Sequence, residues 1–273
     1  MTTIWPGSLL IVGCGNMGGA MLQGWLAGGL DPASVTIIDP VLDSAPPGVA
    51  LFKSTSELAE GFVPDALLLG IKPQLLDQVA PSLVPLMNGQ TIVLSMLAGV
   101  ELDTLQARFP AAKGYVRLMP NLSAAIGKSP IGLAASVELA DADRDAVFAC
   151  MQPLGTPQWI DEQQFDLVTA LVGSGPAFVY RFIDALAAGS VELGLPPEQA
   201  QALALAMVEG GAQLASSSPY GPGELADRVA SPGGTTRAGL DVLDDQSSLF
   251  RLVEDTLRAA RDRGAEMARE ARK

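Results

Sequence analysis

Histidine is absent from this chain of 273 residues, and only two cysteines occur. Without an imidazole, the protein cannot use a serine–histidine triad, the histidine base of many dehydrogenases, or most zinc chemistry. Cys14 and Cys150 lie far apart in the sequence, so they match neither a disulfide framework nor a zinc motif. We therefore expect no metal site and a reducing, cytoplasmic location.

Charged residues are scarce at 17%, aromatic residues at 5%, and the formal net charge is −13. This acidic balance argues against nucleic acid and anionic membranes as partners and leaves a small-molecule substrate as the expectation. The sequence has no uninterrupted apolar run long enough to span a membrane. Because the overall field repels anions, an anion site must be built locally from backbone N–H groups and helix N-termini.

The first half of the sequence alternates short apolar runs with amphipathic segments, which is the pattern of parallel βαβ units. Strands are predicted at Leu9–Gly13, Val35–Asp39, Ala66–Gly70, Thr91–Ser95, Tyr115–Met119 and Ile131–Ala135, with helices at Met17–Ala27 and Gln74–Leu86. Beyond about residue 160 no strand is expected. Helices are predicted at Pro176–Glu192, Pro197–Ala215, Gly223–Ala230, Thr235–Leu243 and Ser247–Arg272.

These patterns predict an α/β chain of two domains. Residues 1–160 would form a Rossmann-type dinucleotide-binding domain, and residues 161–273 an all-helical dimerisation and substrate domain. The helical half carries Ala, Leu and Val on several faces, which is typical of helices that pack against a partner. The alternative is that these helices cap the sheet domain of their own chain.

The segment Gly13-Cys14-Gly15-Asn16-Met17-Gly18 follows a predicted strand and opens a predicted helix. G-x-G-x-x-G is a weak motif alone, but this context is the one that dinucleotide binding requires. Gly13 permits the tight turn, Gly15 lets a pyrophosphate approach the backbone, and Gly18 allows close helix–strand packing. A glycine-rich turn without a ligand is the alternative, and Cys14 is interpreted as a small filler in this loop.

Asp39 ends the second predicted strand, where a carboxylate can accept hydrogen bonds from the adenosine ribose. It would repel the 2′-phosphate of NADP, and the first cation after it in the sequence is Lys53. The alternative is a turn aspartate before Pro40 that makes no contact with a cofactor. Two more loops, Gly70-Ile71-Lys72-Pro73 and Ser95-Met96-Leu97-Ala98-Gly99, follow later strands at the carboxyl ends where open α/β sheets bind ligands. The alternative for each is an ordinary connecting loop.

Two hydroxyl- and glycine-rich segments open helices in the second half. They are Gly173-Ser174-Gly175-Pro176-Ala177 and Ser231-Pro232-Gly233-Gly234-Thr235-Thr236. Free N–H groups and hydroxyls at a helix start form a suitable cradle for a substrate carboxylate. The hydroxyls could also be plain helix caps, although a cap needs only one residue.

Taken together, these motifs resemble pyrroline-5-carboxylate reductase over nearly the whole chain. The resemblance is carried by Gly13–Gly18, Gly70–Pro73, Met119-Pro120-Asn121, Gly173–Phe178 and, most specifically, Ala226–Asp241. It implies reduction of 1-pyrroline-5-carboxylate to L-proline with NADPH or NADH, by a homodimer or higher homo-oligomer. It also implies an active site formed between the cofactor domain of one subunit and helices of the pair.

The resemblance and the motifs together nominate the site residues. The cofactor side comprises Gly13, Cys14, Gly15, Asn16, Met17, Gly18, Asp39, Gly70, Ile71, Lys72, Pro73, Ser95, Met96 and Leu97. The substrate side comprises Glu162, Ser174, Ser231, Gly233, Gly234, Thr235 and Thr236. By similarity, Thr236 lies near the ring nitrogen and is the catalytic candidate. The acidic Asp39 departs from the family's usual pattern and predicts that NADH is accepted; Arg228 also departs and is given no role.

Two other functions fit parts of the pattern. A β-hydroxyacid-type dehydrogenase also joins a Rossmann half to helices. Such enzymes resemble one another in using a lysine of the C-terminal helices as acid or base. This chain has no lysine between Phe165 and Phe250, which argues against that function. A related imine could be the substrate instead. A non-catalytic nicotinamide-binding protein would leave the cluster at 231–236 unexplained.

Overall fold

The computed structural model describes residues 5–271 of the chain. These residues divide into two compact units, which we describe separately: a sheet unit, whose described part is 5–173 and 260–271, and a helical unit, 174–259. The division places Glu162 in the sheet unit and the Ser231–Thr236 segment in the helical unit. The expected domain boundary at residue 160 stays a prediction.

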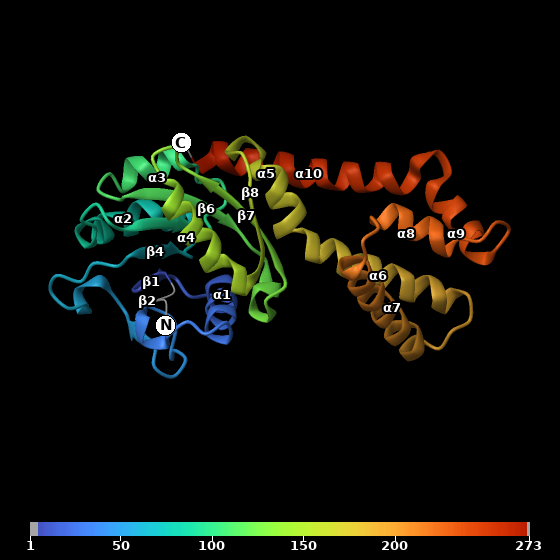
Figure 1. The fold of residues 1–273 in the computed structure, drawn as a ribbon, viewed down its shortest axis with the longest axis horizontal. Coiled ribbons are helices and arrows are strands. Elements are labelled where there is room, and N and C mark those ends of the chain that lie inside the picture. The colour runs from blue at the N-terminus through green and yellow to red at the C-terminus, as the bar shows by residue number, and fades with distance from the viewer. Residues whose placement is uncertain (1–4, 272–273) are drawn as a thin grey trace. The chain divides into compact units, whose positions relative to one another are not determined.

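The sheet unit is built on one eight-stranded sheet in the order β3-β2-β1-β4-β5-β6-β7-β8 (Figure 1, blue to green). Its strands are β1 (Leu9–Val12), β2 (Val35–Ile38), β3 (Ala50–Phe52), β4 (Ala66–Leu69), β5 (Ile92–Ser95), β6 (Gly114–Met119), β7 (Ser129–Ala135) and β8 (Gly155–Trp159). All neighbouring pairs are parallel except β6 and β7. The strand order reverses between β1 and β4, which is the switch point where such sheets bind dinucleotides.

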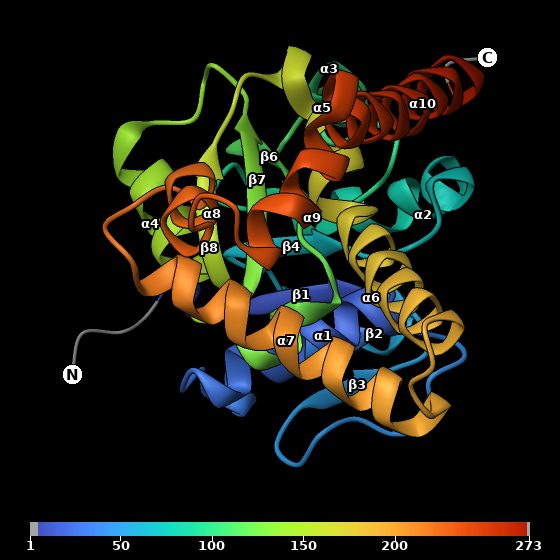
Figure 2. The same ribbon diagram turned by 90° about the vertical axis from the view of Figure 1, so that its right-hand side faces the viewer.

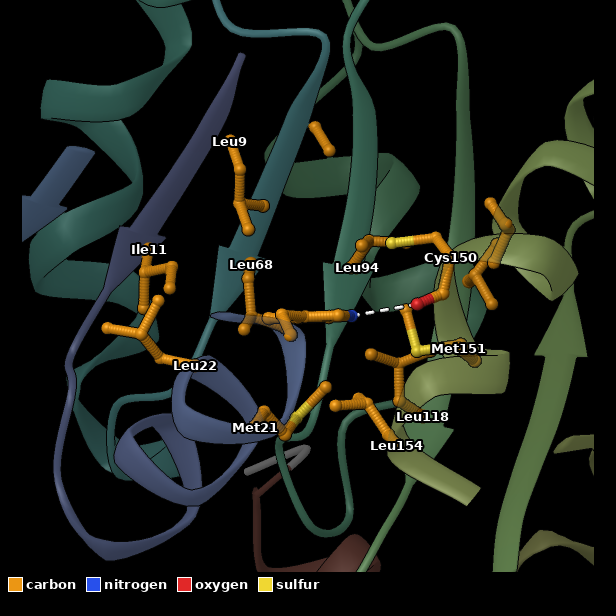
Figure 3. Close-up of a cluster of buried hydrophobic side chains, with 14 of the residues drawn as sticks. Leu9, Ile11, Met21, Leu22, Leu68, Leu94, Leu118, Cys150, Met151 and Leu154 are labelled. Carbon is orange, nitrogen blue, oxygen red and sulfur yellow. Dashed lines mark hydrogen bonds between the residues drawn. The ribbon is translucent and has the colours of Figure 1, made fainter. Parts of the chain in front are cut away.

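Alternate residues of the central strands face opposite layers, so both faces of the sheet are buried. Leu9 and Ile11 belong to one hydrophobic cluster, whereas Leu10 and Val12 belong to the other. Helices α1 (Asn16–Ala27), α2 (Leu76–Leu83), α3 (Leu102–Arg108) and α4 (Asp141–Met151) complete these layers. In the first cluster the indole N–H of Trp25 donates to the carbonyl of Cys150 at 2.8 Å, the dashed line of Figure 3. A continuous apolar run is what a strand buried on both faces requires.

The sequence predicted the central strands but not the two edge strands, β3 and β8. β3 is apolar but only three residues long, and β8 has the sequence Gly-Thr-Pro-Gln-Trp, which is not an apolar run. The sheet unit also contains α5 (Phe165–Val168) and a π-helical turn, Thr169–Gly173, which follow β8 in the sequence. Such π-helical turns occur frequently at functional sites.

The helical unit contains α6 (Gly175–Glu192), α7 (Pro197–Ser217), α8 (Pro222–Val229), α9 (Thr235–Asp244) and the first half of α10 (Ser248–Ala271). Figure 2 shows α6 and α7 as a helical hairpin. All residues of this unit are described, and the buried ones are three alanines, Ala200, Ala204 and Ala230. The predicted end of the last helix, Arg272, lies outside the described residues.

No helix among residues 5–271 combines the length and apolar character needed to cross a membrane. Within the same described range, no three His, Cys, Asp or Glu side chains gather as a metal site.

Candidate active site

The glycine loop after β1 packs directly against the loop after β4. Gly13 has φ 85°, and its N–H donates to the carbonyl of Ile38 at 2.9 Å. A Cβ at Gly13 would lie 2.9 Å from the carbonyl carbon of Gly70, and one at Gly70 would lie 2.4 Å from the carbonyl oxygen of Gly13. Both distances are shorter than van der Waals contact, so only glycine fits at either position.

The N-terminus of α1 is open for an anion. Its N-cap is Gly15, so no side chain caps the helix, and the first turn contains no acidic residue. A Cβ at Gly15 would meet nothing within 4 Å, whereas one at Gly18 would lie 2.8 Å from the carbonyl oxygen of Gly13. Unpaired N–H groups, the positive end of the helix dipole and an unobstructed approach are what a pyrophosphate needs. The predicted neighbours Asn16 and Met17 form this first turn.

Cys14 is a buried residue of this loop. Burial, together with the nearby charge of Asp39, raises the pKa of the Cys14 thiol to about 11. The thiol is therefore protonated at neutral pH and a poor nucleophile. This chemistry agrees with a filler beside the loop rather than a redox group.

Asp39 is tied into the backbone on both carboxylate oxygens. Oδ2 accepts from the N–H of Cys14 at 2.8 Å, and Oδ1 accepts from the N–H groups of Val41 and Leu42 at 2.9 and 3.0 Å. Burial opposes its ionisation, but these bonds and the charge of Lys53 outweigh burial and lower the pKa of Asp39. The ammonium of Lys53 donates to the carbonyl of Leu42. The cation that is distant in the sequence is therefore a neighbour of Asp39 in space.

The remaining predicted cofactor residues follow β4 and β5, which are adjacent strands with Leu69 paired to Ser95. Lys72 is exposed and immediately precedes the short 3-10 turn Pro73–Leu75. The hydroxyl of Ser95 accepts from the N–H of Leu97 at 3.3 Å. Ile71 and Met96 line the tight contact at Gly13 and Gly70. The structure thus places the predicted cofactor residues at the carboxyl ends of neighbouring strands.

Glu162 lies in the sheet unit and forms an ion pair with Arg117. Its Oε1 accepts from Nη1 of Arg117 at 3.1 Å and from the N–H of Leu102, the first residue of α3, at 2.8 Å. Burial lowers the pKa of Arg117, while the charges of Glu162, Asp166 and Glu101 oppose that shift. Arg117 is not among the site residues predicted from the sequence. Its signal in the sequence is a single cation inside the apolar strand Tyr115–Met119.

The segment Met119-Pro120-Asn121 supports the π-helical turn that leads to Ser174. The side-chain amide of Asn121 donates to the carbonyl of Val172 at 3.1 Å. A Cβ at Gly173 would lie 3.1 Å from the sulfur of Met119. Ser174 begins the helical unit and precedes α6, but its side chain makes no cap hydrogen bond.

The segment Ser231–Thr236 joins α8 to α9 inside the helical unit. Gly233 has φ 71°, a left-handed conformation that favours glycine. The N–H of Gly234 donates to the carbonyl of Ser231 at 2.9 Å. Gly234 itself is the N-cap of α9, so neither threonine acts as its cap. Within the described chain, the hydroxyls of Ser231, Thr235 and Thr236 make no hydrogen bond.

The plain-cap interpretation of these hydroxyls therefore does not describe the geometry. The three hydroxyls lie at the start of a helix and form no hydrogen bond with the described residues, so they are available to a ligand.

Comparison with known proteins identifies the family. Residues 162–267 match the family model described as pyrroline-5-carboxylate reductase dimerisation, and residues 8–99 match one described as NADP oxidoreductase, coenzyme F420-dependent. The pyrroline-5-carboxylate reductase of Pseudomonas aeruginosa is 32% identical over 267 residues, which cover 95% of this chain and 96% of that protein. The chain belongs to the pyrroline-5-carboxylate reductase family.

Other members of the reductase family agree over similar lengths. The protein named pyrroline-5-carboxylate reductase 2 of Bacillus subtilis is 34% identical over 256 residues, 90% of this chain and 91% of its own. A solved reductase from Coxiella burnetii superimposes with a TM-score of 0.87 at 27% identity, covering 95% and 98% of the two chains.

The Plasmodium falciparum pyrroline carboxylate reductase, solved with NADP bound, gives a TM-score of 0.83 at 25% identity. It covers 96% of this chain and 98% of that one. The predicted family and fold class are confirmed, and the protein is a nicotinamide-dependent oxidoreductase of this family.

Proposed function

We propose that this protein reduces 1-pyrroline-5-carboxylate to L-proline with a reduced nicotinamide dinucleotide. The observation that carries the proposal is the similarity to reductases of that name across both halves of the chain, 95% of it in the Pseudomonas aeruginosa case. The two matching family models, over residues 8–99 and 162–267, include the glycine loop and the Ser231–Thr236 segment, so the features expected of cofactor and substrate binding occur together.

On the cofactor side, the open N-terminus of α1 would hold the pyrophosphate with backbone N–H groups. Lys72 and the Ser95–Leu97 loop, at the ends of adjacent strands, would bind and orient the rest of the molecule. The cofactor supplies the hydride when it is bound. The protein's part is to fix the geometry of donor and acceptor, which is worth up to about 7–11 kcal/mol of a reaction barrier.

On the substrate side, we assign the carboxylate to the N–H groups of Gly233 and Thr235, because the N–H of Gly234 is already donated to Ser231. The hydroxyls of Ser231 and Ser174 would add donors. The hydroxyl of Thr236 would orient the ring nitrogen and relay a proton through water. An imine nitrogen is basic enough to be protonated without a strong acid, which suits a chain lacking histidine.

Glu162 would face the substrate with Oε2, since both of its described hydrogen bonds end on Oε1.

One assay tests the proposed reaction. Purified enzyme is mixed with 1-pyrroline-5-carboxylate and either NADH or NADPH, and cofactor oxidation and proline formation are followed together. We expect both to proceed at equal rates. A β-hydroxyacid with the oxidised cofactor serves as the comparison substrate and should give no reaction. Cofactor binding without oxidation in the presence of the imine would contradict the proposal.

We also propose that NADH is used at least as well as NADPH. The supporting observation is the ionised Asp39, tied to the glycine loop where the adenosine ribose would lie. Like charges about 4 Å apart cost on the order of 1–4 kcal/mol at intermediate to high dielectric. Lys53 offsets part of this cost, because it lies close enough to affect Asp39.

The cofactor proposal is tested with Asp39→Ser, which should shift the ratio of kcat/KM values toward NADPH. The ratio is measured within each variant, so partial unfolding cancels. Asp43→Ser removes an exposed carboxylate from the same loop and should leave the ratio unchanged. A wild-type preference for NADPH above about tenfold, or about 1.4 kcal/mol, would show that Asp39 does not set this choice.

Finally, we propose that the protein is at least a homodimer through residues 165–273. The exposed apolar side chains of the helical unit support this, because water-exposed leucine, phenylalanine and valine on neighbouring helices indicate a partner. Sedimentation should find a dimer or larger assembly at assay concentration.

A further inference from the structure

Arg117 is the one charged residue in the apolar strand β6, and its surroundings are unusual. Its side chain is 4% exposed and pairs with Glu162 at 3.1 Å. Its guanidinium carbon lies 3.7 Å from the centre of the Phe165 ring. Among the buried side-chain atoms of the described residues, its Nε alone has no hydrogen-bond partner. The side chain is thus held by one ion pair and one aromatic face.

The arginine cluster of Arg117, Glu162 and Phe165 connects two segments that are far apart in the sequence. The first is the loop after β5. Ser95 is the direct strand partner of Arg117, and the loop that follows ends at Leu102, whose N–H donates to Glu162. One carboxylate oxygen therefore joins Arg117 to the start of α3.

The second segment is the chain that leads to Ser174. Glu162 belongs to the turn before α5, and Phe165 is the first residue of α5. The π-helical turn Thr169–Gly173 follows directly. Arg117 therefore contacts both the turn and the helix that set the direction of this segment.

A stabilising role alone does not account for this arrangement. Replacing a buried ion pair by apolar residues is often neutral or stabilising, because desolvation of the charges is costly. A planar guanidinium stacked on a ring and paired to a shared carboxylate does fix orientation. The cluster is thus better suited to setting geometry than to adding stability.

We propose that Arg117 is a positioning residue for hydride transfer, which locks the Ser95–Leu102 segment and the Glu162–Gly173 segment in register through Glu162 and Phe165. This inference rests on the proposed function. Arg117 acts through its neighbours, and it touches neither substrate nor cofactor.

The variants Arg117→Met and Arg117→Lys test the proposal. In Arg117→Met, kcat should fall about tenfold to a hundredfold, the range for misplacement at a distance from the chemistry. The dissociation constant of the reduced cofactor should stay nearly unchanged, because the glycine loop is untouched. Arg117→Lys retains the charge and should recover part of kcat. Adding Phe165→Leu to Arg117→Met should lower kcat little further, because Arg117 and Phe165 act as one unit.

The matched control is the ion pair of Lys113 and Asp143, joined at 2.8 Å in the same sheet unit. Lys113→Met removes a cation that precedes the same strand but has no link to either segment. Its kcat should equal that of the wild type.

Hydrogen exchange supplies a readout that does not depend on activity. Arg117→Met should speed exchange both at the start of α3, including the amide of Leu102, and in the π-helical turn. Lys113→Met should affect neither segment. A loss of thermal stability with unchanged kcat per folded enzyme would overturn the proposal, and so would faster exchange in only one segment.

If the wild-type enzyme does not turn over the imine, the proposed reaction fails, while exchange in the two segments still decides the role of Arg117. If Arg117→Met does not fold, Arg117→Lys and Phe165→Leu, which removes the aromatic face, carry the same comparison.

Discussion

The sheet unit and the helical unit bury their apolar side chains to very different extents. In the sheet unit, two clusters of leucine, isoleucine, valine and methionine cover both faces of the strands. In the helical unit, the buried residues are three alanines, while the large apolar side chains are half-buried or exposed. None of the 18 residues of α6 is buried. One unit completes its core within the chain, and the other leaves its apolar surface uncovered.

This difference indicates which contacts hold each half of the proposed site in its conformation. The glycine loop is held by contacts inside the sheet unit, such as those of Gly13 with Ile38 and Gly70. The Ser231–Thr236 segment sits between short helices without a core of their own. We expect the first half-site to form in any folded chain, and the second to depend on association with another copy.

The largest expected effect comes from placing a charge on the apolar surface of the helical unit. Leu203 is 59% exposed on α7. Leu203→Asp would bury an unpaired carboxylate in a dimer interface, which costs several kcal/mol, so we expect a monomer without activity. Sedimentation and the imine assay measure both properties.

Val137→Asp is the matched control, because Val137 is 94% exposed in the sheet unit and should tolerate a charge. An active monomer in the Leu203 variant would remove the contrast between the units.

A second test compares a leucine from each unit. Leu68 is fully buried in the central strand β4, and Leu68→Ala should lower the free energy of unfolding by about 2–5 kcal/mol at every protein concentration. Leu203→Ala should instead destabilise in a way that depends on concentration, because it weakens association. Urea unfolding at several concentrations distinguishes the two. If both variants respond to concentration alike, the sheet unit is not autonomous.

The third prediction concerns the hydroxyl of Thr236. Thr236→Ala should lower kcat/KM by one to three orders of magnitude, about 1.4–4 kcal/mol, because it removes the group proposed to orient the ring nitrogen. Fold and cofactor affinity should survive. Thr256→Ala is the control, since that hydroxyl donates to the carbonyl of Leu252 within α10. An unchanged rate in Thr236→Ala would remove this residue from the proposed site.

The same contrast explains what the sequence could predict. The central strands, the glycine loop and the helical half were recognisable because burial on both faces leaves continuous apolar runs and tight turns need glycine. The edge strands β3 and β8 were missed because β3 has only three residues and β8 contains glycine, threonine, proline and glutamine instead of an apolar run.

The ion pair of Arg117 and Glu162 was not predicted, because the two residues are 45 positions apart in the sequence. Their spacing along the chain gives no indication that they are in contact. The nearness of Lys53 to Asp39 is of the same kind, because it depends on the pairing of β2 with β3.

The smallest expected effect tests how firmly the sheet unit holds its glycine loop. The carboxylate of Asp39 accepts three backbone hydrogen bonds, and its pKa in the folded protein is lowered. A folded-state pKa below the unfolded value of about 3.9 means that the stabilisation is fully present above that pH. It is lost as the pH falls through the folded-state pKa.

Asp39→Asn retains the shape and one acceptor but removes the charge. Wild type should therefore exceed Asp39→Asn in unfolding free energy by a constant amount between about pH 6 and pH 8, about 1 kcal/mol at most after solvent screening. The gap should narrow below about pH 4. Asp43→Asn, whose carboxylate accepts no hydrogen bond from the described residues, should show no such gap. A gap for Asp39 that stays constant into acid would mean that its hydrogen bonds, rather than its charge, hold the end of β2 against the glycine loop.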